Sequence, residues 1–509
     1  MGKNKQLVVN IGTNLLSFLM NCIINFLITP YIVEQLGSEA NGFVKLANDF
    51  ANYATLLTVA LNSMASRYLM IEYHNRNIKE AKKYYSSLMV ANAVLSAIIA
   101  IPAVLIVVFI EKTNLDIPAA LLGQVRLTFA ITFTKFLIDL LFSANSICFY
   151  LTNRLDKSNL RNVESNVIKT ACTVGFLAFF GADISYVALA TLIASLYVIV
   201  INIYYKNKLT PELKFNIKDF EFAKVKTLIA SGIWNSVTKL SQLLTSGLSL
   251  LITNLWVGAT EMGYLSVAKT VPNLMISLNG SLAGMFTPNM NMLYAEKKTD
   301  ELVKAVKSSL KIMTMFVAIP NAILVSLGME FYHLWIPSQP AKVLQILAIL
   351  TVMNSIITGP IQPIYQIFTV MNKVKQSCKV MLVFGVTSIT LTYFAVKYTS
   401  VGVYGVTSIS MSGSILVALC YHIPYSAKYL GRSKFTFYPE VFKSVVSFFV
   451  LSVLGYGIKA LVPIDGWVTW FAEAIVLGVL GLCINFFLVL SKHERIMLTD
   501  MVKRKLKRN

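Results

Sequence analysis

The chain contains 509 residues, of which 56% are hydrophobic and only 14% are charged. Soluble domains carry roughly 25% charged residues, so this composition excludes a soluble globular protein and indicates an integral membrane protein. The net charge of +21 would suggest nucleic-acid binding in a soluble chain, but no surface of interleaved aromatic and basic residues accompanies it, and we expect no nucleic-acid partner.

Long apolar runs follow one another along the chain, beginning with residues 8–33. The run 88–110 exceeds the ~20 residues that a helix needs to cross a ~30 Å hydrocarbon core, and it lacks the alternating pattern of a membrane β-strand. We therefore predict an all-α polytopic membrane protein. Its fourteen predicted spans are residues 8–33, 43–70, 84–109, 123–149, 163–180, 184–205, 227–256, 263–288, 305–327, 342–371, 377–396, 401–425, 441–460 and 466–490.

The connections between these spans are alternately basic and nearly uncharged. By the positive-inside rule the basic connections lie in the cytoplasm, and an even number of spans then places both termini there. The sequence therefore predicts a multi-pass protein of the bacterial cytoplasmic membrane, whose basic excess reflects topology and attraction to anionic lipid headgroups. The basic connections lie near residues 3–5, 76–83, 154–161, 206–226, 297–304, 373–379, 428–434 and 503–509.

The cysteine and histidine residues give no sign of a metal site or a disulfide. The six cysteines are scattered and lie mostly within apolar runs, and the four histidines are isolated, so no zinc-binding spacing occurs. The sequence also contains no nucleotide-binding G-x-x-x-x-G-K-[ST] loop. We therefore expect neither a cofactor nor a metal ion.

The first two predicted spans recur as the seventh and eighth when the sequence is shifted by 221 residues. Each half then has six spans and enters the membrane from the same side, which predicts a parallel repeat. The predicted domains are an N-terminal lobe (1–205), a basic cytoplasmic linker (206–226), a C-terminal lobe (227–425), and two added helices with a basic cytoplasmic tail (426–509). Equivalent pairs include Gly37 with Gly258, Gly42 with Gly263, Ala47 with Ala268 and Asn52 with Asn273.

Polar side chains on the first and seventh spans form two matching stripes. At 100° per residue the polar positions of the first span lie within an arc of ~80°, and such a stripe must face protein or water. Hydrogen bonds between helices would satisfy one stripe, but the symmetric recurrence favours a wet cleft between the halves. The stripes contain Asn10, Asn14, Ser17, Asn21 and Asn25, and Ser231, Asn235, Thr238, Gln242 and Ser246.

Charged residues inside the spans are the second group of candidates. Lys45 and Asp49 stand four residues apart on one helical face, where they can neutralise each other. Lys135 and Asp139 repeat this spacing near the middle of a span, where an ionised group is by default a functional hypothesis. Snorkelling to the interface is the alternative for Lys45, and a structural pair is the alternative for Lys135. The further charged candidates are Arg67, Lys239 and Lys269.

Three stretches are similar to a known transporter family. The stretch TPYIVEQLGSEANGFVKLA (29–47), its counterpart VGATEMGYLSVAKTV (257–271) and the basic turn MNKVKQ (371–376) resemble the polysaccharide transporter family, the O-antigen and capsule-unit flippases. This family belongs to the multidrug/oligosaccharidyl-lipid/polysaccharide exporter (MOP) superfamily. The likeness covers nearly the full chain, although its motifs are fixed by position more than by identity.

The resemblance implies two six-helix lobes around a central cavity and a flippase that translocates a polyprenyl-pyrophosphate-linked oligosaccharide by alternating access, for surface polysaccharide biosynthesis. Lysines in such a cavity would offset the pyrophosphate charge, and amides would bind sugar hydroxyls. The implied partners are this lipid-linked oligosaccharide, membrane lipids, a polysaccharide polymerase and export machinery. The candidate substrate-binding residues are Asn14, Asn21, Asn25, Lys45, Asp49, Arg67, Lys135, Asp139, Asn235, Lys239, Gln242 and Lys269.

Three other functions stay open. Drug exporters of the superfamily usually carry a cation-coupling acid in the first span, where this chain has asparagines and places Glu34 only at the edge. Flipping of a peptidoglycan precursor is a second alternative. A membrane-embedded polysaccharide polymerase or ligase is a third, but such an enzyme needs a sizeable outer loop, and the longest predicted one is residues 328–342. We therefore expect a transporter and not an enzyme.

Overall fold

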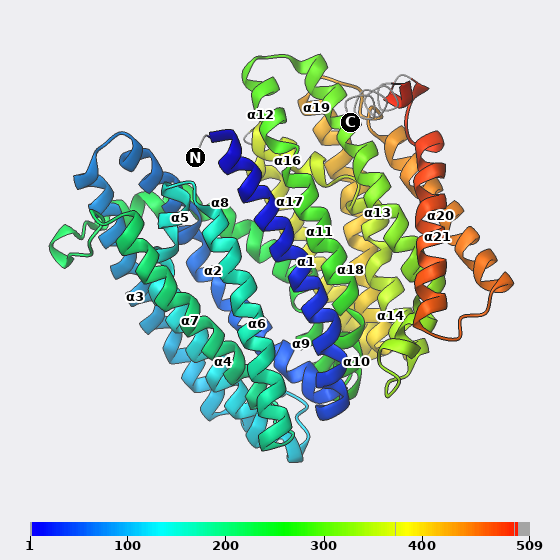
Figure 1. The fold of residues 1–509 in the computed structure, drawn as a ribbon, viewed down its shortest axis with the longest axis horizontal. Helices are drawn as coiled ribbons and strands as arrows, with labels where there is room; N and C mark the ends of the chain where they lie inside the picture. The colour runs from blue at the N-terminus through cyan, green and yellow to red at the C-terminus, as the bar shows by residue number, and fades with distance from the viewer. Residues whose placement is uncertain (1–2, 372, 493, 497–509) are drawn as a thin grey trace. The chain divides into compact units, whose positions relative to one another are not determined.

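The computed structural model describes residues 3–371, 373–492 and 494–496 (Figure 1). All secondary structure in these ranges is helical, as predicted. Residue 372 of the basic turn 371–376 and the basic tail 497–509 lie outside the described residues.

Two compact units share the chain, Met1–Val267 and Ala268–Asn509. The boundary falls inside the predicted span 263–288, so the helices of the predicted span 227–256 pack with the first unit. The predicted lobes 1–205 and 227–425 describe a sequence repeat rather than this packing, and they stay a prediction together with the linker 206–226.

The first unit consists of α1 (Lys3–Leu36), α2 (Ser38–His74), α3 (Ile78–Val108), η1 (Ile110–Lys112), η2 (Ala119–Leu121), α4 (Leu122–Phe142), η3 (Ser143–Ser146), α5 (Ile147–Leu151), α6 (Leu155–Phe180), α7 (Ser185–Leu209), η4 (Ile217–Asp219), α8 (Phe222–Gln242), the π-helical turn η5 (Leu243–Gly247), α9 (Ser249–Trp256) and α10 (Ala259–Ala268), whose last residue opens the second unit.

The second unit continues with α11 (Thr270–Gly284), α12 (Thr287–Ala295), α13 (Thr299–Trp335), α14 (Ala341–Met353), α15 (Ser355–Thr358), α16 (Gln362–Val370), α17 (Val374–Tyr398), α18 (Gly402–Val417), the π-helical turn η6 (Ala418–His422), α19 (Ile423–Tyr429), α20 (Tyr438–Leu461) and α21 (Trp467–Leu488).

Eleven helical segments of the described chain are long and apolar enough to cross a membrane. Three predicted spans, 43–70, 227–256 and 263–288, are helical but do not belong to these eleven. The turn η5 interrupts the second of them, and a break at Lys269 interrupts the third. These three spans carry most of the charged candidates. Charged side chains lower the mean hydropathy of a helix, which is consistent with the absence of these spans from the eleven.

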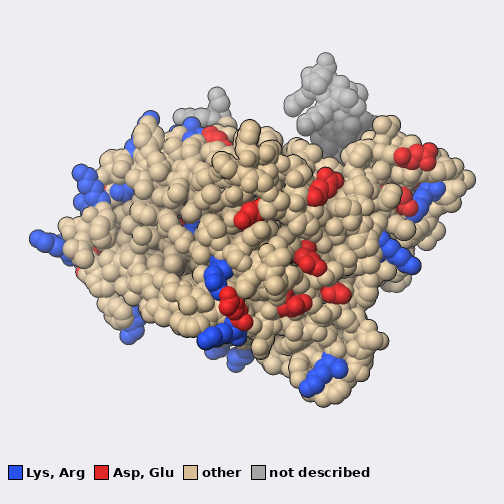
Figure 2. All heavy atoms as spheres, turned by 90° about the horizontal axis from the view of Figure 1, so that it is seen from below, with Lys and Arg blue, Asp and Glu red and all other residues tan. Residues whose placement is uncertain are grey.

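Figure 2 shows one face of the protein, where charged side chains are scattered over a surface made mainly of other residues.

In the first unit, α2 packs against α3, α4 and α8. Apolar side chains from three of these helices, including Leu61, Leu88 and Leu228, are fully buried together. Gly232 brings α8 close to α2, since a Cβ atom at this position would lie only 1.9 Å from the carbonyl oxygen of Ala60. Small residues that allow such close approach are typical of helix pairs in membranes.

The first turns of α2 pack against α10 through residues that are equivalent in the predicted repeat. Glu39 accepts a hydrogen bond from Thr260, 221 residues further on. A Cβ atom at Gly42 would lie 3.2 Å from the Cα atom of Gly263, its own equivalent. Residues that contact their own equivalents are expected where a two-fold axis passes between two copies, and such an axis is what a parallel duplication would produce.

In the second unit, the 37-residue helix α13 packs against α14, α20 and α21. Buried residues Ala318, Ala322, Phe448 and Leu451 join α13 to α20. The two helices added after the predicted repeat, α20 and α21, are thus attached to this unit through α13 (Figure 1).

Candidate functional site

Polar side chains of α8 that face α2 form a row of hydrogen bonds, which we call the α2–α8 row. Its α8 members are four residues apart, so they lie on one side of the helix. The row pairs Lys239 Nζ with Asn52 Oδ1 at 2.9 Å, Asn235 Nδ2 with Ser63 Oγ at 3.0 Å, and the hydroxyls of Ser231 and Tyr68 at 2.8 Å.

The α2–α8 row lies on the open edge of the helix pair. Asn52 and Ser63 are exposed, and Lys239 is only half-buried. On the covered side of the same pair, Ser236 Oγ donates to the carbonyl oxygen of Leu56 at 3.0 Å. The seventh-span stripe therefore contributes to helix–helix contact and also presents ammonium, amide and hydroxyl groups at an accessible surface.

A π-helical turn follows the row at the end of α8. Gln242, the last residue of α8, is exposed, and the hydroxyl of Tyr53 donates to the carbonyl oxygen of Gly247 in η5 at 3.0 Å. π-Helical turns inside α-helices are frequent at functional sites. This turn places Gln242 beside an irregular stretch of backbone.

The charged pair that begins α2 lies next to α10. Lys45 Nζ donates to the carbonyl oxygen of Ser266 at 2.5 Å, and Asn41 Nδ2 donates to the hydroxyl of the same residue at 3.0 Å. Lys45 and Asp49 are both half-buried. Contact with a backbone carbonyl within the fold argues against simple snorkelling of Lys45 into a lipid interface.

Lys135 and Asp139 form the predicted ion pair on α4, with Nζ 2.8 Å from Oδ2. Ser195 of α7 donates a hydrogen bond to the other carboxylate oxygen of Asp139. Lys169 of α6 interacts electrostatically with Lys135. The sequence reasoning missed Lys169, although a lysine inside the apolar span 163–180 was a sufficient signal.

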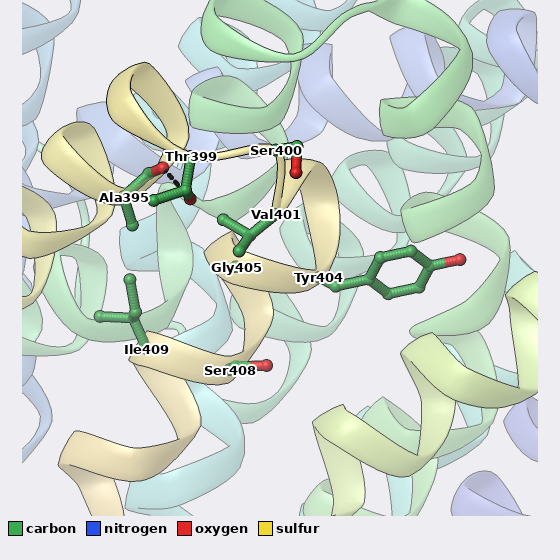
Figure 3. Close-up of a pocket in the computed structure, with 8 residues that line it drawn as sticks. All are labelled: Ala395, Thr399, Ser400, Val401, Tyr404, Gly405, Ser408 and Ile409. Carbon is green, nitrogen blue, oxygen red and sulfur yellow. Dashed lines mark hydrogen bonds between the residues drawn. The ribbon is translucent and has the colours of Figure 1, made fainter.

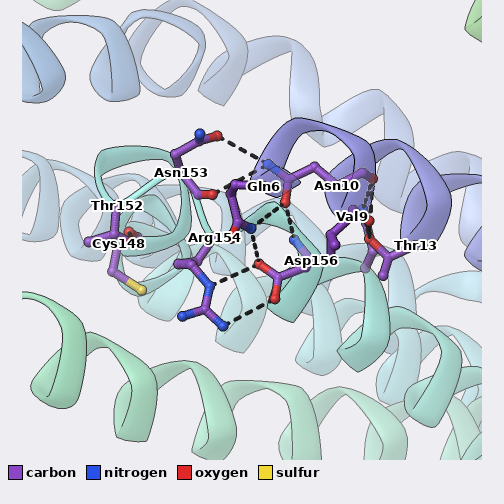
Figure 4. A network of polar contacts seen from close by, with 10 residues as sticks. Gln6, Val9, Asn10, Thr13, Cys148, Thr152, Asn153, Arg154 and Asp156 are labelled. Atoms are coloured by element: carbon purple, nitrogen blue, oxygen red, sulfur yellow. Dashed lines mark hydrogen bonds and ion pairs between the residues drawn. The ribbon is translucent and has the colours of Figure 1, made fainter. Parts of the chain in front are cut away.

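The first turns of α1 are tied to the start of α6 by a polar network (Figure 4). Asn10 Nδ2 donates to Asn153 Oδ1 at 3.1 Å, and Asn10 Oδ1 accepts from the backbone N–H of Asp156 at 2.9 Å. Gln6 donates to Asp156 Oδ1 at 2.9 Å. Asp156 also bonds Arg154 and raises the pKa of that guanidinium. This end of the first-span stripe is therefore helix–helix contact.

The rest of the first-span stripe makes fewer contacts with other helices. Asn14 and Asn21 are exposed, and Asn25 Nδ2 donates within α1 to the carbonyl oxygen of Asn21 at 2.8 Å. The amides of Asn14 and Asn21 are therefore exposed, and Asn21 also accepts a hydrogen bond from Asn25 through its side-chain oxygen.

Two further predicted site residues lie apart from these groups. Arg67 of α2 is exposed. Lys269 belongs to the second unit, where it is half-buried at the break before α11. A hollow of about 570 Å³ in the same unit lies between α17 and α18 near Thr399, Tyr404 and Ser408 (Figure 3), and none of the predicted site residues line it.

The intramembrane charges of the first unit are mainly positive, and they are accompanied by amides and hydroxyls. This composition suits an anionic ligand with many hydroxyl groups. Within the described ranges, no three His, Cys, Asp or Glu side chains are grouped so as to hold a metal ion. Within the predicted spans of this unit the basic residues are Lys45, Arg67, Arg126, Lys135, Lys169 and Lys239, and the acidic residues are Asp49, Asp139 and Glu164.

No protein-family model matches the chain. It is 26% identical over 490 residues to a protein of Bacillus subtilis (strain 168) named "Uncharacterized membrane protein EpsK", with 96% of this chain and 97% of the relative covered. The name of this relative indicates a membrane protein, and the eleven apolar helical segments of the present chain indicate a multi-pass one.

The fold is similar to those of solved transporters. The lipid II flippase MurJ in an inward closed conformation superposes with a TM-score of 0.70 and 16% identity, covering 97% of this chain and 100% of that one. An inward-facing multidrug resistance MATE transporter gives a TM-score of 0.64 at 16% identity, covering 83% and 98%. A MOP superfamily transporter from Pyrococcus furiosus gives 0.57 at 15% identity, covering 84% and 94%. The chain therefore has the fold of MOP superfamily transporters.

Proposed function

We propose that the protein is a flippase that moves a polyprenyl-pyrophosphate-linked oligosaccharide across the bacterial cytoplasmic membrane by alternating access, for surface polysaccharide biosynthesis. The observation that carries the proposal is the α2–α8 row, where the ammonium of Lys239 and the amide of Asn235 lie on an accessible edge. Such groups are costly within a membrane, and substrate pathways are one of the functional sites that they mark.

The chemistry of the row matches the two polar parts of this substrate. A pyrophosphate carries at least two negative charges, whose transfer through hydrocarbon alone is prohibitive. Lys239 has a neutral partner in Asn52, so its positive charge is available to a phosphate. The amides of Asn14, Asn21 and Asn235 can donate to sugar hydroxyls and accept from them.

The other predicted site residues take supporting roles in this proposal. Lys135 carries its own counter-ion in Asp139, so the proposed role of Asp139 is to hold the lysine or to carry a coupling proton. The remaining proposed substrate contacts are Asn25, Lys45, Asp49, Arg67, Gln242 and Lys269.

The proposed setting follows from the charge distribution along the chain. By the positive-inside rule we propose that both termini and the basic connections lie in the cytoplasm, where the substrate would be loaded. The proposed partners are the lipid-linked oligosaccharide, surrounding membrane lipids, and a polysaccharide polymerase with its export machinery downstream. We propose no catalytic role, because the solved proteins with this fold are transporters and a flippase.

A second candidate is flipping of a peptidoglycan precursor. The superposition on a lipid II flippase covers that protein completely, and such a substrate would make similar demands on cationic and amide side chains. Drug export is less well supported, since α1 carries asparagines along its accessible stripe in place of an acid.

A deletion strain separates these functions. We expect loss of surface polysaccharide, accumulation of the lipid-linked repeat unit in the inner leaflet, and normal peptidoglycan synthesis. A unit that reaches the outer leaflet but stays unpolymerised would indicate a polymerase and contradict the proposal. Arrested peptidoglycan synthesis, with unflipped precursor, would favour the second candidate.

A further inference from the structure

Three helices of the second unit meet closely where α20 and α21 pack on α13. A Cβ atom at Gly455 of α20 would lie 2.2 Å from Ser326 Oγ of α13 and 2.9 Å from Leu477 Cδ2 of α21. The indole of Trp470 also donates to the carbonyl oxygen of Leu327 at 3.0 Å. The absence of a side chain at Gly455 lets all three helices approach at this level.

One helical turn away, each of the three helices carries a charged side chain. Glu330 follows Ser326 by four residues on α13, and Lys459 follows Gly455 by four residues on α20. Lys459 Nζ lies 2.5 Å from Glu330 Oε1. Glu473 precedes Leu477 by four residues on α21, so it faces the same level, and its charged neighbours are Glu330 and Lys459.

Glu473 is the covered member of this cluster. Glu473 as a whole residue is 4% exposed, whereas the side chains of Lys459 and Glu330 are 29% and 22% exposed. Among the described residues, neither carboxylate oxygen of Glu473 has a hydrogen-bond partner, and the same is true of Glu330 Oε2. Buried polar atoms usually have partners, so three carboxylate oxygens without one call for a physical reason.

The charges of the cluster do not balance. Two carboxylates and one ammonium leave one negative charge among packed helices where Glu473 is buried, and a buried uncompensated ion is strongly disfavoured. Lys459 is committed to Glu330 through their ion pair. The simplest neutralisation is a proton on the second carboxyl, as in paired carboxylates whose environments differ.

We propose that Glu473 is a proton-binding site, with Glu330 as the group through which its proton enters and leaves. When Lys459 turns from Glu330 to Glu473, the O–H bond of Glu473 breaks and a new O–H bond forms on Glu330, so that charge and protons balance without a further reactant. Glu330 is the more exposed acid and exchanges the proton with water. This relay is argued from the second unit alone and does not depend on the proposed transport function.

Infrared difference spectroscopy of the full-length protein in lipid nanodiscs, titrated with pH, tests the relay. We expect the carbonyl band of one protonated carboxyl per chain at neutral pH, and its loss in Glu473→Gln, which has nearly the shape of the protonated acid. Lys459→Met should add a second such band, because Glu330 then loses its counter-ion.

Glu440→Gln is the matched control on α20. Glu440 is also buried, but Lys307 lies 4.0 Å away with no second acid in this ion pair, so the band should persist. An identical band in the native protein and in Glu473→Gln, with both folded by circular dichroism, would overturn the proposal. So would loss of the native band on adding sodium at fixed pH, since that would indicate a cation site.

Discussion

Lys239 stands in the α2–α8 row with a neutral partner, the amide oxygen of Asn52. A neutral partner leaves the full positive charge available to an anion, so charge should matter more than shape at this position. We expect Lys239→Met to lower surface polysaccharide export by roughly tenfold, which corresponds to about 1.4 kcal/mol of lost interaction. Lys239→Arg should keep part of the activity, because its planar fork replaces the ammonium imperfectly.

Export and the amount of protein in the membrane are measured together. Lys226→Met is the matched control, since Lys226 is an exposed lysine near the start of the same helix and should tolerate the change. Equal export by the native chain and Lys239→Met, at equal protein levels, would rule out a substrate role for Lys239.

Asp139 can act in two ways that give different mutational results. If it only holds Lys135, Asp139→Ala should cost roughly 1 kcal/mol of stability for this half-exposed pair, and Lys135→Ala with Asp139→Ala should export better than Lys135→Ala alone. If it carries a coupling proton, Asp139→Asn should abolish export and the double change should not rescue it.

We favour the holding role because Asp139 already contacts Lys135 through one carboxylate oxygen and accepts from Ser195 through the other. Export and thermal stability of the single and double variants decide between the roles. Unchanged export in both single alanine variants, at normal protein levels, would exclude either role in transport.

Which contacts of the site were predictable depends on how far apart the partners lie in the chain. Lys135 and Asp139 pair within one helix, four residues apart, so helical periodicity alone predicts their contact. Lys239 and Asn52 are 187 residues apart, and only the packing of α8 on α2 brings them together. Lys169 lies near Lys135 only because α6 and α4 both pack against α7, which no local pattern encodes.

The helix pair α2–α8 depends on close backbone approach at Gly232. A Cβ atom there would lie 1.9 Å from Ala60 O, which the backbone of α2 cannot easily avoid. We expect Gly232→Ala to destabilise the protein by about 1–3 kcal/mol, as overpacking usually does, and to separate the members of the α2–α8 row.

Thermal unfolding of the purified protein measures this change. Gly12→Ala is the control, because nothing lies within 4 Å of a Cβ atom at Gly12 in α1. A lower melting temperature in both variants alike would mean that the close approach at Gly232 has no special importance.

The polar stripe on α1 shows that helical periodicity does not predict which residues of one helix face are buried. Periodicity places Asn10, Asn14 and Asn21 on one face, and it treats them as equivalent. In the structure Asn10 is buried against the α5–α6 turn, whereas Asn14 and Asn21 are exposed. The difference comes from a neighbouring segment that lies more than 140 residues away in the sequence.

At the scale of the whole molecule, hydropathy predicts helices more reliably than it predicts how they are grouped. All fourteen predicted spans are helical over most of their length, yet the compact units divide at Val267, inside a predicted span. Contacts between equivalents, such as Gly42 with Gly263, lie within the first unit. A repeat boundary and a packing boundary therefore need not coincide.

The predicted topology is tested by cysteine labelling in a variant without the six native cysteines. Cysteines at Asn114 and Ser400 should react with a membrane-impermeant reagent added to whole cells, and those at Asn77 and Ser433 should react only after the cells are opened. All four positions are exposed in the structure, so burial cannot explain protection. External labelling at Asn77 or Ser433 would contradict the positive-inside assignment.

The most direct test of the proposed function is flipping by the purified protein in liposomes that contain the lipid-linked oligosaccharide of its host. The fraction of oligosaccharide accessible to an external, impermeant glycosidase reports translocation. We predict that the native protein makes the inner-leaflet pool accessible and that Lys239→Met does so at least several times more slowly. Accessibility that never exceeds the outer-leaflet pool, with folded protein in the liposomes, would contradict the proposal that this protein is a flippase.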